Sequence, residues 1–435
     1  MKKVLSVFLS LALCLGLSTN AFAVAPWALD GLCEAESLEL LTMADMEHLE
    51  ASVTPEKLAA VAEGVRAKLA LLGVPARAHV PTARRGDVTR GGVLAALYDA
   101  AACFSFEGVE AGSVNYLAGL GVVKGDQNGD YALDRPCTLQ ETFLFAQRLV
   151  LTLYDRADAG SRGLLWKVEQ GDNVLYLFGS YHVDRGDLYP FHKSVRDMIT
   201  ASETVCFEID FGDVEGAQDF YSYYYYPAGD CLKNHLEAAD YLAAVEALAA
   251  MGWDEATVNS VKAWGVGNAL SQLSYMDEST GASRMVTDTY LYSKAVCNGK
   301  AVEQVESYGY QGALLDGLSE AVQVSMVREG LAALRGEGEE IADLFTPWQR
   351  GDLTGFEGSL KKDAVPATAE ERELNDALYT QRDRGMTAWC KDFLTQEGAH
   401  TATMVVGAGH MVGKTGVVES LRAAGYAVEQ LSAGK

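Results

Sequence analysis

Three short runs of apolar, β-branched or aromatic residues place the strongest constraint on how this chain can fold, at residues 174–178, 204–207 and 403–406. Runs of this length and composition are typical of strands that are buried on both faces of a sheet. Between the second and third runs, apolar residues recur at helical spacing over residues 239–251 and 314–334. Strands that alternate with long helices predict an α/β (α+β) domain in which helices surround one mixed sheet.

The part of the chain before these strands has a different pattern. A chain of 435 residues, 49% of them hydrophobic, is too long for one typical core, so we expect two domains. Residues 24–155 read mostly as helices with polar connections and predict a small, mainly helical N-terminal domain. Residues 156–163 are small and polar and lack periodic apolar positions, which predicts a linker to a second domain over residues 164–435.

The first 23 residues have the features of a secretory signal peptide. Lys2 and Lys3 precede an apolar run over residues 4–17, and residues 21–23 form the small-x-small pattern that signal peptidase accepts. The apolar run is short for a membrane span, and no later segment has about 18 consecutive apolar residues. We therefore predict an exported protein, secreted or associated with the cell surface, without a transmembrane segment.

The net charge bears on the partners of the chain, and the cysteine content bears on its disulfides. The formal net charge is −25, and an anionic surface of this size repels nucleic acid, so we expect no nucleic-acid partner. Cys14 falls within the predicted signal peptide, and the other seven cysteines show no C-x-x-C spacing. Their odd number argues against a full disulfide framework, so either one thiol stays free or the producing cell lives in a reducing setting.

Two of the predicted strands lead into the same motif, Gly-x-x-His, at residues 179–182 and 407–410. The glycine allows a tight turn after the strand, and the histidine then projects from the strand's carboxyl end, where α/β folds build their sites. The remaining run leads into Glu208, which needs a cation, an arginine or a metal if it is buried. His182, His410 and Glu208 together form a reasonable ligand set for a divalent ion that activates water.

The order of these motifs resembles the TraB/GumN/Tiki family. The likeness begins with Leu-Trp-Lys-Val at residues 165–168, continues through Trp-Gln-Arg-Gly-Asp at residues 348–352, and ends with Val-Gly-Ala-Gly-His-Met-Val-Gly at residues 406–413. It covers about residues 162–432. The family implies a proposed metalloprotease activity that uses manganese or cobalt and acts on a peptide or protein substrate.

The resemblance implies roles for particular residues. His182 and His410 would bind a divalent metal ion (Mn, Co or Zn, its identity open), with Glu208 as third ligand or as general base. Arg382, in Gln-Arg-Asp at residues 381–383, would clamp an oxyanion or a carboxylate. Asp383 stands where the family has asparagine. The leading hypothesis is thus an exported, metal-dependent peptide hydrolase.

Several features leave two interpretations open. Asp288 and Glu306 resemble family acids, which either orient a ligand histidine or form a helix cap or surface pair. Tyr221 and the tyrosines at residues 223–226 either stack on a peptide or pack within the protein. The alternative function is a non-catalytic exported protein that binds peptides in the same cleft or associates with the cell wall.

Residues 87–150 resemble one S-layer homology (SLH) repeat and the tail of another. The likeness rests on a helix start after Thr89 and Arg90, a Gly-Val-Val-Lys-Gly-Asp loop at residues 121–126, and a second helix start at Thr138. A Thr-Arg pair in such repeats helps to hold an anionic cell-wall polymer, but Leu139 follows Thr138 in the second copy. The region is therefore interpreted either as a cell-wall binding unit or as a small helical spacer.

Overall fold

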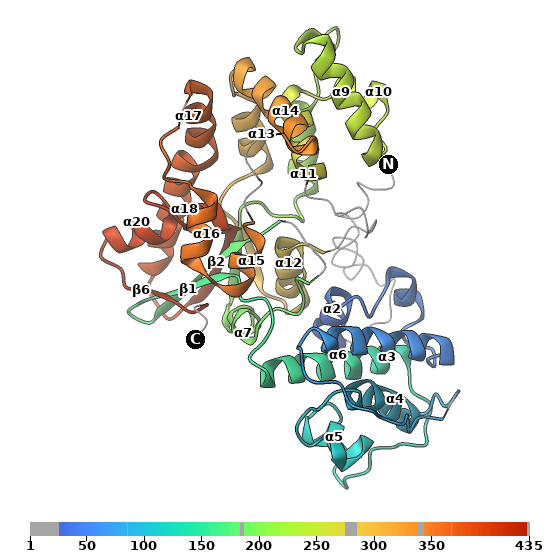
Figure 1. Ribbon diagram of the computed structural model, residues 1–435. Helices are drawn as coiled ribbons and strands as arrows, with labels where there is room; N and C mark the ends of the chain where they lie inside the picture. The colour runs from blue at the N-terminus through green and yellow to red at the C-terminus, as the bar shows by residue number, and fades with distance from the viewer. Residues whose placement is uncertain are drawn as a thin grey trace.

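The computed structural model describes residues 26–84, 86–182, 187–274, 285–337, 343–366 and 368–432. The predicted signal peptide, residues 1–23, lies outside these ranges. Within them, no helix is both long and apolar enough to cross a membrane. The N-terminal helices lie at one end of the molecule and a second helical group at the other, with the sheet between them (Figure 1).

Six strands form one mixed sheet with the order β4-β3-β5-β2-β1-β6. Strands β2, β5, β3 and β4 are parallel, whereas β1 pairs antiparallel with both β2 and β6. This sheet confirms the predicted α/β class. The strands span Leu164–Gln170 (β1), Asn173–Ser180 (β2), Thr204–Phe207 (β3), Ala301–Gln304 (β4), Thr401–Gly407 (β5) and Val428–Gln430 (β6).

The middle of the sheet is covered on both faces. Every side chain from residue 402 to residue 406 of β5 is buried, although successive side chains point to opposite faces. Helices α7 (Lys193–Ala201) and α12 (Thr287–Cys297) pack together and contact β5, β3 and β4. Helix α18 (Gln381–Leu394) packs against β2 and against α20 (Val417–Ala423).

The chain before β1 is helical, and threonine caps set the starts of its longest helices. Thr54, Thr89 and Thr138 each accept a hydrogen bond from a backbone N–H in the first turn, and Glu141 completes a capping box with Thr138. The elements are η1 (Pro26–Ala28), α2 (Leu29–Ser37), η2 (Met43–His48), α3 (Pro55–Ala70), α4 (Arg90–Ala102), η3 (Val109–Ala111), α5 (Ser113–Gly119) and α6 (Leu139–Arg156). A domain boundary at residues 156–163 stays a prediction.

The Thr-Arg pair of the SLH-like region, Thr89 and Arg90, makes hydrogen bonds to other residues of this chain. Thr89 caps α4, and the Arg90 guanidinium donates to Glu141 Oε1 at 2.9 Å and to the carbonyl oxygen of Tyr131 at 2.9 Å. The Arg90 side chain is only 13% exposed. These contacts account for the arginine without a polymer ligand, and cell-wall binding stays a prediction.

The helical group at the far end has an apolar core of its own. Leu232, Tyr241, Leu248, Val261 and Leu270 belong to it, whereas a separate core runs from the N-terminal helices into the sheet. The elements of this group are α8 (Val214–Tyr224), η4 (Leu232–Asn234), α9 (Ala238–Leu248), η5 (Ala249–Met251), α10 (Glu255–Ser260), α11 (Ala263–Ser274), α13 (Tyr308–Asp316) and α14 (Glu320–Leu334).

The helical pattern over residues 314–334 is confirmed, but it is divided between two helices. Helix α13 ends at Asp316, and α14 begins at Glu320 after Ser319, whose hydroxyl accepts from the Val322 N–H. Capping by Ser319 competes with continuation of the helix. The elements that lead back to β5 include α15 (Phe345–Arg350), α16 (Leu353–Leu360), α17 (Ala369–Asn375) and the π-helical turn η6 (Asp376–Thr380), and α19 (Ala408–Met411) follows β5.

Candidate functional site

The four parallel strands deliver the candidate residues to one edge of the sheet. In the register of these strands Ser180 pairs with Gly407, and Phe207 pairs with both Val405 and Gln304. The residues that follow the strands therefore emerge side by side, as expected at the carboxyl ends of parallel strands. They are His182 after β2, Glu208 after β3, Glu306 after β4 and His410 after β5.

His182, Glu208 and His410 converge on one point beside Gly407. A Cβ atom on Gly407 would lie 3.3 Å from Glu208 Oε1, 3.5 Å from His182 Nε2 and 3.6 Å from His410 Cδ2. Glu208 Oε1 accepts the Gly407 N–H at 2.7 Å and lies 3.9 Å from His410 Nε2. The absence of a side chain at Gly407 thus leaves room at the centre of the three groups.

Glu208 is held as an anion by its neighbours. Arg382 Nη2 donates to Glu208 Oε2 at 2.6 Å, and Gln311 Nε2 lies 3.3 Å from the same oxygen. Burial alone would raise the pKa of Glu208, but the positive charges of His410, Arg382 and His182 and the Gly407 N–H lower this pKa to about 2. The carboxylate has the arginine partner that its burial requires.

Arg382 bridges two carboxylates. Besides Glu208, it donates through Nε to Glu306 Oε1 and through Nη2 to Glu306 Oε2, both at 2.8 Å. Its third nitrogen, Nη1, has one long contact of 3.4 Å with the Leu378 carbonyl oxygen. Glu306 therefore holds the arginine and not a histidine, and Nη1 is the part of Arg382 least committed to the protein.

Each of the two histidines has a carboxylate at its Nδ1 atom. His182 Nδ1 lies 2.9 Å from Asp288 Oδ2, and His410 Nδ1 lies 2.7 Å from Asp383 Oδ1. The Asp288 charge raises the pKa of His182 to about 9, although burial opposes the shift. A carboxylate at Nδ1 fixes the ring and leaves Nε2 for another partner, as is usual for metal-binding histidines.

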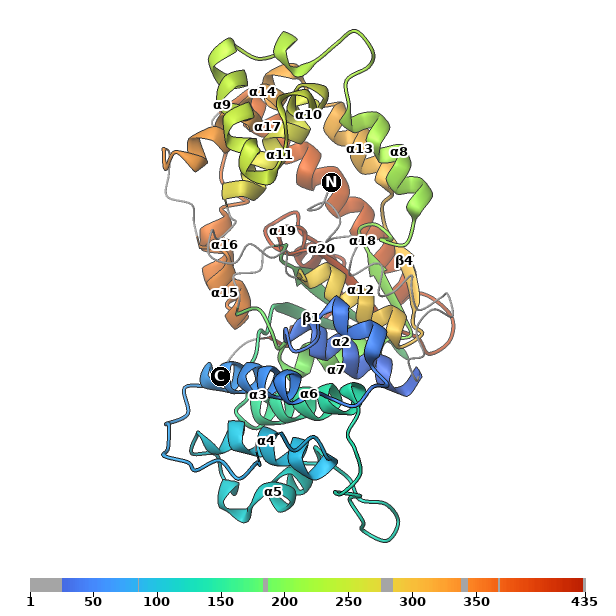
Figure 2. The same cartoon turned by 90° about the vertical axis from the view of Figure 1, so that its right-hand side faces the viewer.

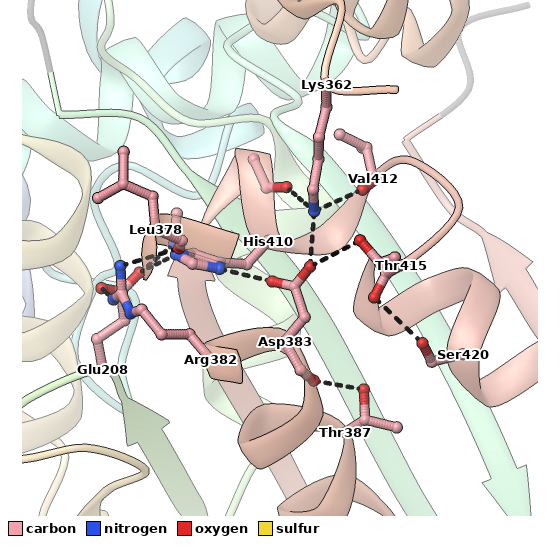
Figure 3. Close-up of polar contacts among 12 residues, drawn as sticks. Glu208, Lys362, Leu378, Arg382, Asp383, Thr387, His410, Val412, Thr415 and Ser420 are labelled. Carbon is pink, nitrogen blue, oxygen red and sulfur yellow. Dashed lines mark hydrogen bonds and ion pairs between the residues drawn. The ribbon is translucent and has the colours of Figure 1, made fainter. Parts of the chain in front are cut away.

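Behind His410, Asp383 forms a buried ion pair with Lys362 (Figure 3). Lys362 Nζ donates to Asp383 Oδ2 at 2.7 Å and to the carbonyl oxygens of Gly409 and Val412 at 2.7 and 3.0 Å. Burial lowers the pKa of Lys362. The lysine thus joins the acid that orients His410 to the backbone on both sides of that histidine.

Tyr379 contacts the same group of residues from a π-helical turn. It belongs to η6, directly before the helix that carries Arg382 and Asp383. Its ring centroid lies 5.5 Å from that of His410 and 4.6 Å from Lys362 Nζ. Single π-helical turns occur frequently at functional sites, where they change the direction of side chains within a helix.

The geometry fits part of a metal site. No three His, Cys, Asp or Glu side chains in the described ranges are gathered closely enough to form a complete metal cage. The 3.9 Å between His410 Nε2 and Glu208 Oε1 is nevertheless compatible with one ion, since two ligands about 2.1 Å from an ion lie at most about 4.2 Å apart. His182 Nε2 faces the same space beside Gly407. Two imidazole nitrogens and one carboxylate oxygen suit a divalent ion.

A cleft of about 940 Å³ opens beside the site. Tyr379 and Lys362 line it at the end that adjoins His410. Its walls come from α14, from α17 and from the segment that follows α16, and they include Val324, Leu360 and Leu374. The cleft is large enough for several residues of an extended peptide.

Sequence reasoning placed four residues in the site, and the structure brings all four together: His182, Glu208, Arg382 and His410. It did not identify the roles of Asp383, Lys362 and Tyr379. Asp383 stood out only as a departure from the family asparagine, whereas Lys362 lies in a turn after α16 and gave no signal. The tyrosines at residues 221 and 223–226 lie on and after α8, outside these contacts.

Comparison with known proteins gives one family and a distant relative. A model of the TraB/PrgY/gumN family matches residues 164–430. A curated protein from Amphimedon queenslandica, described as a "Metalloprotease TIKI homolog", is 24% identical over 330 residues, which cover 63% of this chain and 62% of the relative. The chain thus spans less than two thirds of that relative. No solved structure gives a significant match.

Proposed function

Because this chain belongs to the TraB/PrgY/gumN family, we propose that it is a metal-dependent peptide hydrolase. The observation that carries the proposal is the convergence of His182 Nε2, Glu208 Oε1 and the His410 ring around Gly407. The relative described as a metalloprotease supports the same reaction class. A divalent ion bound there would polarise the scissile carbonyl and activate a water molecule.

In this proposal the two histidines and Glu208 have separate roles. His182 and His410 would hold the ion through Nε2, because Asp288 and Asp383 occupy their Nδ1 atoms. Glu208 offers Oε1, since Arg382 and Gln311 engage Oε2. That oxygen acts either as third ligand or as the base that takes a proton from water.

We assign Arg382 two roles that use different atoms. Nε and Nη2 keep Glu208 ionised and hold the carboxylates of Glu208 and Glu306 in place. Nη1 then stabilises the oxyanion that develops on the substrate, provided that the substrate lies against Leu378, where this nitrogen now makes its long contact. The peptide reaches this point from the cleft that Tyr379 and Lys362 line.

Metal-dependent cleavage tests the proposal. The purified full chain should cleave an unstructured peptide library in the presence of Mn²⁺, Co²⁺ or Zn²⁺, lose the activity on chelation and regain it when metal is restored. His182→Ala and His410→Ala should lose both metal and activity. His400→Ala is the matched control, because His400 is 40% exposed and contacts the Glu397 carbonyl oxygen. Cleavage that survives chelation and both site variants would refute the proposal.

Glu208→Gln separates the two roles of the glutamate. Glutamine keeps the size and one acceptor oxygen but cannot take a proton from water, and loss of a general base typically costs about 10²- to 10⁴-fold in rate. If Glu208 is the base, Glu208→Gln should bind metal with a stoichiometry near that of the unchanged protein but lose most of its turnover. If Glu208 is a metal ligand, the metal affinity of Glu208→Gln should fall together with its turnover.

The second candidate is a non-catalytic protein that binds peptides in the cleft. The observation in its favour is that Glu208 already has a cationic partner in Arg382 and a backbone donor in Gly407. Saturable binding of library peptides, without cleavage at any metal concentration and unchanged in His182→Ala, would establish this function in place of the first.

We also propose that the protein is exported and that its mature chain begins at Val24. The proposal rests on the basic, apolar and small-residue segments of the predicted signal peptide. Amino-terminal sequencing of the extracellular protein should find Val24 as the first residue. A chain that retains Lys2 and Lys3 and stays inside the cell would contradict it.

A further inference from the structure

Two cysteines that are far apart in the sequence meet between α2 and α12. Cys33 belongs to α2 and is buried, Cys297 is the last residue of α12, and their Sγ atoms are 2.8 Å apart. A movement of less than about 1 Å would bring the sulfurs to the length of a disulfide, about 2.05 Å. We infer that Cys33 and Cys297 form a disulfide that ties the N-terminal helices to the domain that carries the site.

Polar contacts on the same two helices hold the cysteines in register. Lys294 forms ion pairs with Asp30 and with Glu34, the latter at 2.9 Å. Asn298 Nδ2 donates to Asp30 Oδ1 at 2.6 Å, and Tyr290 OH donates to Glu34 Oε1 at 2.7 Å. Figure 2 shows α2 lying beside α12. The approach of the two sulfurs is therefore part of an extended interface and not a chance meeting of two exposed side chains.

Other thiols of the described chain have different neighbours. Cys103 donates to a backbone oxygen, Cys206 lies near the carbonyl of Phe207, Cys137 accepts from Thr142, and Cys390 lies 3.6 Å from the sulfur of Met404. One bond between Cys33 and Cys297 also agrees with the odd number of cysteines after residue 23, which a complete set of pairs does not.

The bond forms by thiol–disulfide exchange with a small-molecule disulfide such as oxidised glutathione. One cysteine thiolate attacks the small molecule and releases one thiol, and the other cysteine then displaces the second thiol from the mixed disulfide. Two protein thiols are oxidised and one external disulfide is reduced to two thiols. The inference does not depend on the proposed hydrolase function.

The disulfide would affect the candidate site, because helix α12 carries both Cys297 and Asp288. Asp288, in the first turn of α12, contacts His182 Nδ1, and Cys297 ends the same helix. A crosslink to α2 would hold this helix, and with it the acid that orients His182. We expect the oxidised protein to unfold at a higher temperature than the reduced protein, by at least about 5 °C, because the bond closes a long loop.

The experiment compares the full chain after treatment with oxidised glutathione and after treatment with dithiothreitol. Oxidation should reduce the number of titratable thiols by two, give one crosslinked peptide that joins Cys33 to Cys297 in a non-reducing digest, and raise Tm. Cys33→Ser and Cys297→Ser should abolish all three changes. Cys231→Ser is the matched control and should keep them, because Cys231 lies in the other helical group.

The digest keeps the test decisive even if a serine variant folds poorly, because it is made on the unchanged protein. An unchanged thiol count after oxidation, or crosslinks that join other cysteines, would overturn the inference. A crosslink without a shift in Tm would retain the bond but remove its stabilising role.

Discussion

The ion pair of Lys362 with Asp383 gives the sharpest prediction about what holds the site together. The two side chains are 5% and 1% exposed, and Lys362 also binds the carbonyl oxygens of Gly409 and Val412. Lys362→Met removes the cation while keeping much of the side-chain length. Asp383→Asn removes the anion while keeping an oxygen that accepts from His410 Nδ1.

Each single change leaves a buried charge without its partner. Breaking a buried pair in this way costs about 3–5 kcal/mol of unfolding free energy. The double variant carries neither charge, so its loss should be smaller than the sum of the two single losses by about 2–3 kcal/mol. In Lys362→Met, the two carbonyl oxygens that also lose a donor should place the loss near the upper end of the range.

Urea unfolding of the four proteins, followed by circular dichroism, measures this coupling. Lys193 and Asp197 form an exposed pair, with side chains 56% and 60% exposed, and serve as the matched control, with an expected coupling below about 0.5 kcal/mol. Losses that add within about 0.5 kcal/mol for Lys362 and Asp383 would refute the reasoning. The pair would then be a solvated contact, and His410 would owe its position to other groups.

Three further predictions concern the site and the response to pH. Gly407→Ala places a methyl group within 3.6 Å of His182, Glu208 and His410, so it should abolish Co²⁺ binding in a spectroscopic titration; Gly385→Ala, with nothing within 4 Å, should not. Asp288→Asn should weaken Co²⁺ binding about 10- to 100-fold in the same titration, because it alters the group that orients His182. Burial raises the pKa of Glu36 from 4.5 to about 7, so the folded state holds the extra proton and stability falls as pH rises from about 4.5 to 7. Glu36→Gln should therefore stabilise the protein at pH 8 by about 3 kcal/mol and leave it unchanged at pH 4. A difference in thermal unfolding that does not depend on pH would contradict this.

The sequence predicted the three neighbouring strands β3, β5 and β2 but not β1, β4 or β6. The runs at residues 174–178, 204–207 and 403–406 became β2, β3 and β5, because a strand buried on both faces must be apolar throughout. Strands β4 and β6 are partly exposed and carry Glu303 and Glu429, so they show no apolar run. Only pairing with a neighbour makes such segments strands.

The residues of the candidate site could likewise be predicted only in part. His182, Glu208 and His410 could be predicted because each follows a recognisable strand, and strand ends meet at one edge. Lys362 could not, because its partner Asp383 lies on a separate helix, and no local pattern predicts a contact between a turn and a helix. The interruption near Ser319 escaped prediction because the apolar spacing continues across it.

The position of β5 in the sheet determines how much of the chain must be synthesised before the sheet can form. This strand ends at Gly407, yet it lies between β2 and β3, which are made more than 190 residues earlier. Until it has been synthesised, β2 and β3 each present an open, apolar edge to which other chains can pair. Contacts at such long sequence separation also form slowly. A chain that terminates before residue 401 should therefore aggregate, because the edges of β2 and β3 stay unpaired until residues 401–407 have been made.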